Sequence, residues 1–302
     1  MKRLGFIGVA GYVATRHLAA MKSLGCDLVM AHDLSDSVGV IDSYFPDAYF
    51  TTDYETFVKA IEKSVDYLAV CTPNHLHYKH SIMGLRAGAD VICEKPLALN
   101  GEELFIMREA EIQSGHRVYP ILQLRLHPEI VRLKQLVDIQ SSDCIHDVEL
   151  TYVVPRGKWY AESWKGDLSR SGGLILNIGV HFIDMLLWVF GSMDNFYVHH
   201  SASDCIAGVM LLKRARVKFF LSINRTYAAD QSSCRRLDID GEKFDFSNGF
   251  SNLHTLCYER IFQGDGFSIA DAAPAIETAS MIQKESVSAL TGDCHPFVRF
   301  VF

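Results

Sequence analysis

The residue whose type and position point most directly to chemistry is Lys95. It stands in the sequence Cys93-Glu94-Lys95-Pro96, at the end of the apolar segment 90–93. A charged pair followed by proline contributes little to packing, because an unpaired charge is costly to bury. In α/β sheets, ligands bind beyond the carboxyl ends of the strands. If segment 90–93 is a strand, we therefore expect Lys95 to contact a ligand.

A second set of polar side chains lies in the apolar segment 172–184. Asn177, His181 and Asp184 are spaced i, i+4 and i+7, so they share one face if the segment is helical. An imidazole titrates near neutral pH, and together with the ammonium of Lys95 it predicts proton transfer at a substrate. The residues alone leave open which of the two is the base. The alternative for His181 is a hydrogen-bonded core residue, and the alternative for Asp184 is a bond to the backbone or the orientation of a neighbouring side chain.

The elements that must position Lys95 form a repeating strand–helix pattern in residues 1–122. The predicted strands are residues 4–8, 27–31, 67–71, 90–93 and 118–122, and the predicted helices are residues 12–24, 53–61, 75–86 and 101–114. Such alternation is typical of a parallel sheet covered by helices. Because 302 residues exceed what one core usually holds, we predict a second domain at residues 123–302.

A loop of small residues joins the first predicted strand to the first helix. Residues 8–13 (GVAGYV) suit a backbone that approaches a pyrophosphate at a helix N-terminus. The match to G-x-G-x-x-G is imperfect, since Ala10 and Val13 occupy the second and third glycine positions. Asp33 ends the second strand, about 20 residues further on, where a carboxylate binds ribose hydroxyls. Residues 34–38 contain no Lys or Arg, so we predict a Rossmann domain that binds NAD.

The pattern changes after residue 122. The predicted elements of the second domain are a helix at residues 126–137 and strands at residues 147–154, 208–212 and 217–223. Asp240-Gly241 lies between two further strand-like segments and is typical of a tight hairpin. Strands joined by hairpins run antiparallel, so the second domain is predicted to be α/β with an open, mostly antiparallel or mixed sheet.

Composition argues against several classes of protein. The formal charge of −7 argues against a nucleic-acid surface, which needs a basic face. Eight cysteines without a C-x-x-C pair are expected to be reduced, as in a cytoplasmic protein. Residues 172–191 have the length of a membrane span, but a central Asp costs about 2.5–3.5 kcal/mol on insertion scales. A buried helix is the better interpretation, and no membrane partner is expected.

Two further sequence features, a possible signal peptide and a possible metal site, are rejected. The N-terminus has a basic start and a short apolar core like a signal peptide, but glycines interrupt the core and the residues suit a nucleotide-binding strand better. His75, His77 and His80 are not accompanied by a carboxylate or cysteine at metal-site spacing. We therefore predict no metal, and expect Thr72 and Asn74 of the same segment to bond the cofactor.

Four motifs, in order along the chain, resemble the Gfo/Idh/MocA oxidoreductases. They are the G-x-x-G loop at residues 8–11, C-T-P-N-x-x-H at residues 71–77, E-K-P at residues 94–96, and G-G-x-x-x-N-x-x-x-H-x-x-D at residues 172–184. The resemblance implies a Rossmann domain, a C-terminal α/β domain whose sheet often forms dimers or tetramers, and a Lys-Pro peptide that is commonly cis. Many members have Asp in place of Asn177. An amide orients a substrate but cannot hold a proton, which leaves proton transfer to Lys95 and His181.

Within the family, the chain resembles the UDP-N-acetylglucosaminuronate 3-dehydrogenases of bacterial lipopolysaccharide O-antigen assembly. The similar segments are residues 11–17, 36–46, 123–127, 156–167, 240–246 and 249–254. These enzymes oxidise the C3′ hydroxyl of the sugar to a ketone with NAD. The resemblance implies the same reaction for this chain. It leaves open whether NADH is released or reoxidised in place by 2-oxoglutarate, and whether the protein is a homodimer or a homotetramer.

The expected site residues form three sets. The catalytic residues are Lys95, His181 and Asn177. The cofactor-binding residues are Gly8, Ala10, Gly11, Tyr12, Val13, Asp33, Ser37, Cys71, Thr72, Pro73, Asn74, His77, Glu94, Lys95, Gln123 and Trp164. The substrate-binding residues are Lys95, Arg125, His127, Arg156, Tyr160, Lys165, Asn177 and His181. The cations in the last set suit the diphosphate and carboxylate of a UDP-sugar acid.

Two other functions remain as alternatives. The first is another sugar or polyol dehydrogenase of the family, but a neutral polyol has no use for the cations in residues 156–165. The second is a non-catalytic NAD-binding sensor, against which the presence of both Lys95 and His181 argues.

Overall fold

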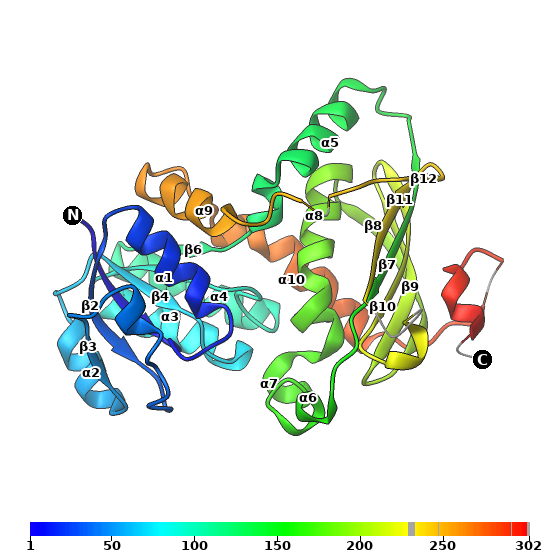
Figure 1. Ribbon diagram of the computed structural model, residues 1–302. Coiled ribbons are helices and arrows are strands. Elements are labelled where there is room, and N and C mark those ends of the chain that lie inside the picture. The colour runs from blue at the N-terminus through cyan, green and yellow to red at the C-terminus, as the bar shows by residue number, and fades with distance from the viewer. Residues whose placement is uncertain (229–232, 247, 291, 301–302) are drawn as a thin grey trace. The chain divides into compact units, whose positions relative to one another are not determined.

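Two compact units make up the computed structural model, which describes residues 1–228, 233–246, 248–290 and 292–300. The first unit is Met1–Leu126 with Phe250–Ala273, and the second is His127–Gly249 with Pro274–Phe302. Figure 1 follows the chain by colour through both units. Each unit is built around one six-stranded sheet.

The sheet of the first unit is entirely parallel. Its strands are β1 (Arg3–Ile7), β2 (Asp27–His32), β3 (Tyr49–Thr51), β4 (Tyr67–Val70), β5 (Asp90–Cys93) and β6 (Val118–Pro120), in the order β3-β2-β1-β4-β5-β6. This is the strand order of dinucleotide-binding folds, in which the winding direction reverses between the first and fourth strands. The predicted Rossmann fold is confirmed, although the short β3 was not predicted.

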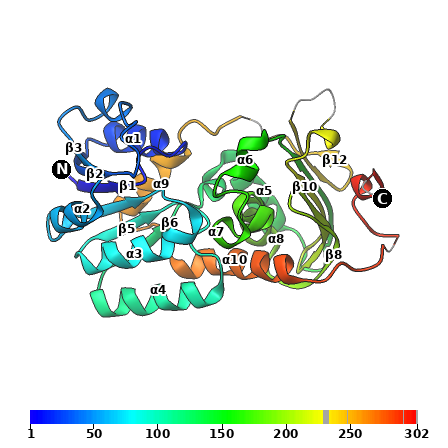
Figure 2. The ribbon, with the colours of Figure 1, turned by 90° about the horizontal axis from the view of Figure 1, so that it is seen from below.

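Helices cover both faces of this sheet. They are α1 (Ala14–Ser23), α2 (Tyr54–Ile61), α3 (His77–Arg86), α4 (Gly101–Ser114) and α9 (Leu253–Phe262), with short 3-10 turns at Ile41–Ser43, Asn74–Leu76 and Gln123–Leu126. Successive strand residues point to opposite faces. Tyr67 joins the core under α1 and α9, whereas Leu68 lies against Gly84 of α3. Figure 2 shows α3 and α4 packed side by side.

Residues 250–273 return to the first unit after the chain has built the second. Cys257, Tyr258 and Ile261 of α9 are buried in the same core as Leu18 and Met21 of α1, and the two helices pack together. The boundary predicted from the sequence, after residue 122, places this segment in the second domain. In the structure, the apolar face of the segment packs on the first unit. The apolar spacing of α9 alone does not say which core it covers.

The sheet of the second unit is mixed. Its strands are β7 (His146–Val153), β8 (Met193–Ser201), β9 (Cys205–Leu212), β10 (Ala215–Ser222), β11 (Cys234–Ile239) and β12 (Glu242–Lys243), in the order β12-β11-β7-β10-β9-β8. β7 and β10 are parallel and the other pairs are antiparallel. Asp240 and Gly241 have φ of 54° and 84°, the left-handed values of a two-residue hairpin turn. The predicted mixed sheet and its hairpin are confirmed.

The helices of the second unit place the predicted catalytic segment. They are α5 (Pro128–Ile139), α6 (Lys158–Glu162), α7 (Leu168–Ser171), a π-helical turn (Ile175–Gly179) and α8 (Val180–Phe190), and α10 (Ile269–Lys284) begins in the first unit and continues into the second. Phe182 of α8 packs on Tyr152 of β7 with ring centroids 4.7 Å apart. Thr151, on the opposite face of β7, bonds His295 near the C-terminus.

The most apolar helical stretch is Leu168–Phe190, which is long and apolar enough to cross a membrane. Within the described part of the chain, 67% of its apolar window is buried inside the structure. Burial against the sheet is the property of a core helix, and it agrees with the interpretation drawn from the sequence.

Helix α4 offers a test of local stability, because the Asn100 side chain caps it by accepting a hydrogen bond from the Glu103 N–H at 3.0 Å. We expect Asn100→Ala to lower the free energy of unfolding by about 1 kcal/mol, the usual cost of a lost N-cap. Urea unfolding followed by far-UV circular dichroism measures the change.

Asn252 is the matched control, since it starts α9 without a side-chain capping bond in the described residues. Asn252→Ala is expected to change the urea midpoint by less than Asn100→Ala does. Equal losses in the two variants would contradict the capping role of Asn100.

Candidate functional site

The glycine loop after β1 lies directly against the end of β4. Gly8 has φ of +86°, and a Cβ atom there would lie 2.6 Å from the carbonyl carbon of Cys71 and 2.7 Å from the nitrogen of Thr72. A Cβ on Gly11 would lie 3.1 Å from the Gly8 oxygen. Glycine is therefore required at position 8 by both conformation and space. The close approach of position 11 to the Gly8 oxygen explains Gly11, which has no counterpart in the G-x-G-x-x-G fingerprint.

The Asp33 side chain bonds this loop, and its predicted contact with a ribose stays a prediction. One carboxylate oxygen accepts the Ala10 N–H at 2.9 Å and the other accepts the Ser35 N–H at 3.0 Å. Each oxygen of a carboxylate can accept more than one hydrogen bond. Asp33 thus holds the loop and keeps acceptor capacity for the hydroxyls of a ribose. Ser37 lies in the following turn, where its N–H donates to the Ser35 hydroxyl, and Tyr12 is 89% exposed.

The loop after β4 contacts the segment that contains Lys95. The two ring nitrogens of His77 lie 2.7 Å from the Pro96 oxygen and 2.6 Å from the Thr72 oxygen. His77 and Asn74 are buried, and Lys95 is half-buried. The Lys95–Pro96 peptide is cis, which confirms the expectation from the family resemblance. The C-T-P-N-x-x-H and E-K-P motifs are thus in direct contact.

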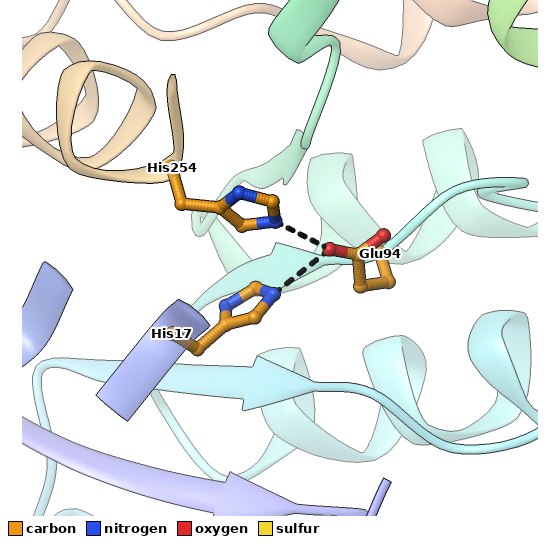
Figure 3. A group of neighbouring side chains, drawn as sticks. All are labelled: His17, Glu94 and His254. Atoms are coloured by element: carbon orange, nitrogen blue, oxygen red, sulfur yellow. Dashed lines mark hydrogen bonds and ion pairs between the residues drawn. The ribbon is translucent and has the colours of Figure 1, made fainter. Parts of the chain in front are cut away.

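Glu94 is enclosed by two histidines that the sequence interpretation missed. Its Oε1 atom lies 2.9 Å from Nε2 of both His17 and His254 (Figure 3). Its Oε2 atom accepts the Lys95 N–H at 3.2 Å. Burial alone would raise the pKa of Glu94, but the hydrogen bonds from the two histidines outweigh it and hold the pKa well below its usual value. His17 occupies an apolar position of α1, which is the one local signal that could have identified it.

Gln123 and Arg125 follow β6 and have different surroundings. The Gln123 Oε1 atom is buried and has no hydrogen-bond partner among the described residues, as expected of a group that bonds a ligand. Arg125 is buried over the Phe267 ring and donates to the backbone carbonyl oxygen of Asp271 at 2.8 Å. The guanidinium therefore also holds the start of α10.

In the second unit, Asn177 and His181 belong to one continuous helical segment. Asn177 lies in the π-helical turn and donates to the Tyr160 hydroxyl at 2.6 Å. His181 lies in the first turn of α8, and both residues are half-buried, whereas Asp184 is buried. Burial raises the pKa of Tyr160, so its phenol keeps the proton. A π-helical turn is wider than an α-helical turn and is frequent at functional sites.

A pair of cations accompanies this helix. Lys165 Nζ lies 4.4 Å from the centre of the Trp164 ring and 5.8 Å from that of Trp159. Burial lowers the pKa of Lys165, and the Arg156 guanidinium lowers it further. No acidic side chain pairs with either cation in the described ranges of the chain. The pair is suited to an anionic ligand.

His127, predicted to contact substrate, has an evident structural role. It is fully buried, and its Nδ1 atom caps α5 by accepting the Glu129 N–H at 3.2 Å. Its Nε2 atom faces the Asn248 oxygen. Contact of His127 with a substrate stays a prediction.

The predicted residues therefore form two groups, one in each unit. The first unit holds the glycine loop, Asp33, the loop after β4, Lys95 and Gln123. The second holds Asn177, His181, Tyr160 and the Lys165–Arg156 cations.

Gly8 gives a direct test of the loop geometry. We expect Gly8→Ala to lower the melting temperature and weaken NAD binding by about tenfold or more, because a backbone atom would have to move and φ of +86° is strained for alanine. Isothermal titration with NAD and differential scanning calorimetry measure the two effects.

Gly39→Ala is the matched control, because a Cβ at Gly39 would meet nothing within 4 Å. It is expected to change neither property appreciably. Unchanged NAD affinity in a folded Gly8→Ala protein would show that the loop geometry does not serve the cofactor.

Comparison with known proteins matches two parts of the chain to one family. Residues 2–121 match the Gfo/Idh/MocA oxidoreductase family model for the NAD-binding Rossmann fold, and residues 130–244 match the family's C-terminal domain. Among curated proteins, the chain is 28% identical over 227 residues to the uncharacterised oxidoreductase ORF334 of Rhizobium meliloti. It is 26% identical over 199 residues to glucose-6-phosphate 3-dehydrogenase of Bacillus subtilis. These alignments cover 72% and 64% of this chain but 64% and 55% of the two relatives.

Solved structures are similar over nearly the whole chain. The WlbA (WbpB) dehydrogenase of Thermus thermophilus in complex with NAD and alpha-ketoglutarate is 42% identical, with a TM-score of 0.94 over 98% of this chain and 100% of that one. The same enzyme in complex with NAD and UDP-GlcNAcA gives 41% identity and a TM-score of 0.93 over the same shares. The WlbA dehydrogenase of Bordetella pertussis, at 20% identity, has a TM-score of 0.79 over 93% of this chain and 94% of that one and shares the fold. The chain belongs to the Gfo/Idh/MocA oxidoreductase family and binds NAD through its Rossmann domain.

Proposed function

We propose that this protein is an NAD-dependent dehydrogenase that oxidises the C3′ hydroxyl of UDP-N-acetylglucosaminuronic acid to a ketone. The observation that carries the proposal is the similarity to a dehydrogenase crystallised with NAD and UDP-GlcNAcA, which extends over 98% of this chain at 41% identity. The residue types at the two groups of site residues support it. The dinucleotide-binding loop lies in the first unit, and His181 lies in the second together with two cations, Lys165 and Arg156, that have no acidic partner among the described residues.

The residues of the first unit fit NAD. Gly8 leaves space that any Cβ would fill, and the buried oxygen of Gln123 lacks a partner in the part of the chain that the structure describes. The glycine loop would hold the pyrophosphate, Asp33 a ribose, and Thr72, Asn74 and Gln123 the nicotinamide end. When bound, NAD supplies the acceptor for the hydride that leaves C3′. The remaining predicted contacts, Tyr12, Val13, Ser37, Pro73 and Trp164, belong to the same proposal.

The proton chemistry falls to Lys95 and His181. His181 would take the proton of the C3′ hydroxyl through an imidazole nitrogen, since neutral imidazole is a base near pH 7. The Lys95 ammonium would donate a hydrogen bond to the same oxygen and stabilise the developing negative charge. Asn177, fixed by the Tyr160 hydroxyl, would orient the sugar by hydrogen bonds. An amide cannot replace either proton-transferring group.

The cations would bind the charged parts of the substrate. Arg156 lies close enough to Lys165 to lower the pKa of the lysine. A bound anion would relieve the repulsion between the two cations. The uronate carboxylate or the diphosphate of the sugar nucleotide supplies that charge. A dicarboxylate such as 2-oxoglutarate has the same chemistry, and reoxidation of NADH in place is part of the proposal. So are a cytoplasmic location, a role in O-antigen synthesis and a homodimeric or homotetrameric state.

The proposed reaction can be tested directly. Purified protein is incubated with NAD and UDP-N-acetylglucosaminuronic acid, with and without 2-oxoglutarate, and the products are analysed by mass spectrometry. We expect the 3-keto sugar nucleotide, and 2-hydroxyglutarate wherever NADH is recycled. A polyol such as inositol serves as the control substrate. Turnover of inositol without turnover of the sugar nucleotide would contradict the proposal and favour a polyol dehydrogenase.

His181→Asn separates catalysis from cofactor binding. We expect kcat to fall by about 10²–10⁴-fold, the usual contribution of general acid–base catalysis, while the Kd for NAD changes less than twofold. The reason is that the imidazole would act on the substrate and lies outside the Rossmann unit. Stopped-flow turnover and titration with NAD measure the two quantities. Retained turnover would exclude His181 as the base.

A further inference from the structure

The cluster of His17, Glu94 and His254 lies next to Lys95 without belonging to the predicted catalytic residues. We propose that these three side chains form a metal-free hydrogen-bonded network that positions Lys95, and that His254 is a positioning residue supplied by α9. The inference rests on the proposed function in one respect, namely that Lys95 contacts the substrate. The cluster itself lies entirely within the first unit.

The direction of each hydrogen bond follows from charge. The ionised Glu94 carboxylate can only accept, so the Nε2 atoms of His17 and His254 must both donate. Burial lowers the pKa of His17, although the hydrogen bond to Glu94 opposes it. A neutral imidazole has a single N–H. Nδ1 of His17 is therefore an acceptor, and the Tyr258 hydroxyl, 2.8 Å away, donates to it.

The network fixes one proton arrangement. Burial raises the pKa of Tyr258 well above its usual value, so the phenol keeps its proton. Donation then runs from Tyr258 to His17 and from His17 to Glu94. His254 donates to the same oxygen, which leaves the second carboxylate oxygen for the Lys95 N–H at 3.2 Å.

The main chain at Lys95 has a polar neighbour on each side. Its N–H donates to Glu94, and the oxygen of the next residue, Pro96, lies 2.7 Å from a ring nitrogen of His77. A lysine side chain is flexible, so the position of its Cα decides where the ammonium can reach. A displacement of about 1 Å in a catalytic group can cost about 10²-fold in rate.

The distances favour hydrogen bonds over a bound metal ion. Zinc binds nitrogen and oxygen ligands at about 2.0–2.2 Å, so the ligand atoms of a tetrahedral site lie about 3.3–3.5 Å apart. Both Nε2 atoms lie only 2.9 Å from Oε1 of Glu94, which is a hydrogen-bond distance. All three residues are also buried.

The three residues of the network come from distant parts of the chain. Glu94 ends β5, His17 belongs to α1, and His254 lies 160 residues further along the chain in the segment that returns to the first unit. The first unit therefore receives the second donor to Glu94 only after the chain has built the second unit. Residues 250–273 would complete the surroundings of Lys95 in addition to packing on α1.

Glu94→Gln tests the network with little change of shape. The amide keeps one acceptor but presents N–H groups where Glu94 accepts from the histidines or from Lys95. We expect kcat to fall about tenfold to a hundredfold, with KM for the sugar nucleotide changed less than threefold. Hydrogen exchange of the Lys95 amide, followed by NMR, is expected to accelerate at least about tenfold, since its acceptor is weakened.

His254 is tested by two variants. His254→Gln keeps an N–H donor and is expected to retain more of kcat than His254→Leu, which keeps none. His146→Gln is the matched control, because His146 is a buried histidine that bonds Asp240 at 2.8 Å in the second unit. It is expected to lower stability without changing kcat or the exchange of the Lys95 amide.

Two outcomes overturn the proposal. One is an unchanged Lys95 exchange rate and unchanged kcat in folded Glu94→Gln protein. The other is stoichiometric zinc by elemental analysis, together with a His17 ring protonated at Nδ1 in ¹⁵N NMR, because coordination through Nε2 moves the proton to Nδ1. If wild-type protein does not turn over the sugar nucleotide but Lys95 exchange accelerates in Glu94→Gln, the proposed function fails and the positioning of Lys95 stands.

Discussion

The first unit depends on the close approach between the backbone at Gly8 and the end of β4. In a parallel sheet the carboxyl ends of all strands lie at one edge, so the loops that leave β1, β4 and β5 must share a small space. A Cβ at Gly8 would lie within 2.8 Å of three backbone atoms of Cys71 and Thr72. Glycine resolves this crowding. It also leaves backbone accessible where a phosphate needs it.

A buried charge is the second constraint on this edge of the sheet. A carboxylate inside a protein is unfavourable unless hydrogen bonds replace its hydration. Glu94 receives three donors, from His17, His254 and the Lys95 backbone. The same bonds that stabilise the charge tie α1, β5 and α9 together. The stability of the first unit and the position of Lys95 therefore depend on one group.

The second unit has a different electrostatic character. Lys165 is held over the faces of two tryptophans and close to Arg156. Aromatic faces attract a cation without neutralising it, so the positive charge stays available for an anion. Asn177 lies in a π-helical turn and is fixed by a buried tyrosine. The cations for an anionic sugar and the base His181 are thus proposed for the second unit, and the cofactor loop and Lys95 for the first.

The sequence by itself determined the elements and the order of the motifs. Apolar periodicity and the turn at Asp240-Gly241 are local, and the structure confirms both. The loop at residues 8–13 and Asp33 predicted NAD binding, and the family resemblance predicted the cis peptide at Lys95. Only the tertiary structure decided that α9 packs on α1 and that His254 shares a carboxylate with His17. The bonds of Glu94 to His17 and to His254 join residues that are 77 and 160 positions apart in the sequence. Such bonds leave no local pattern, because the tertiary fold decides which distant residues meet.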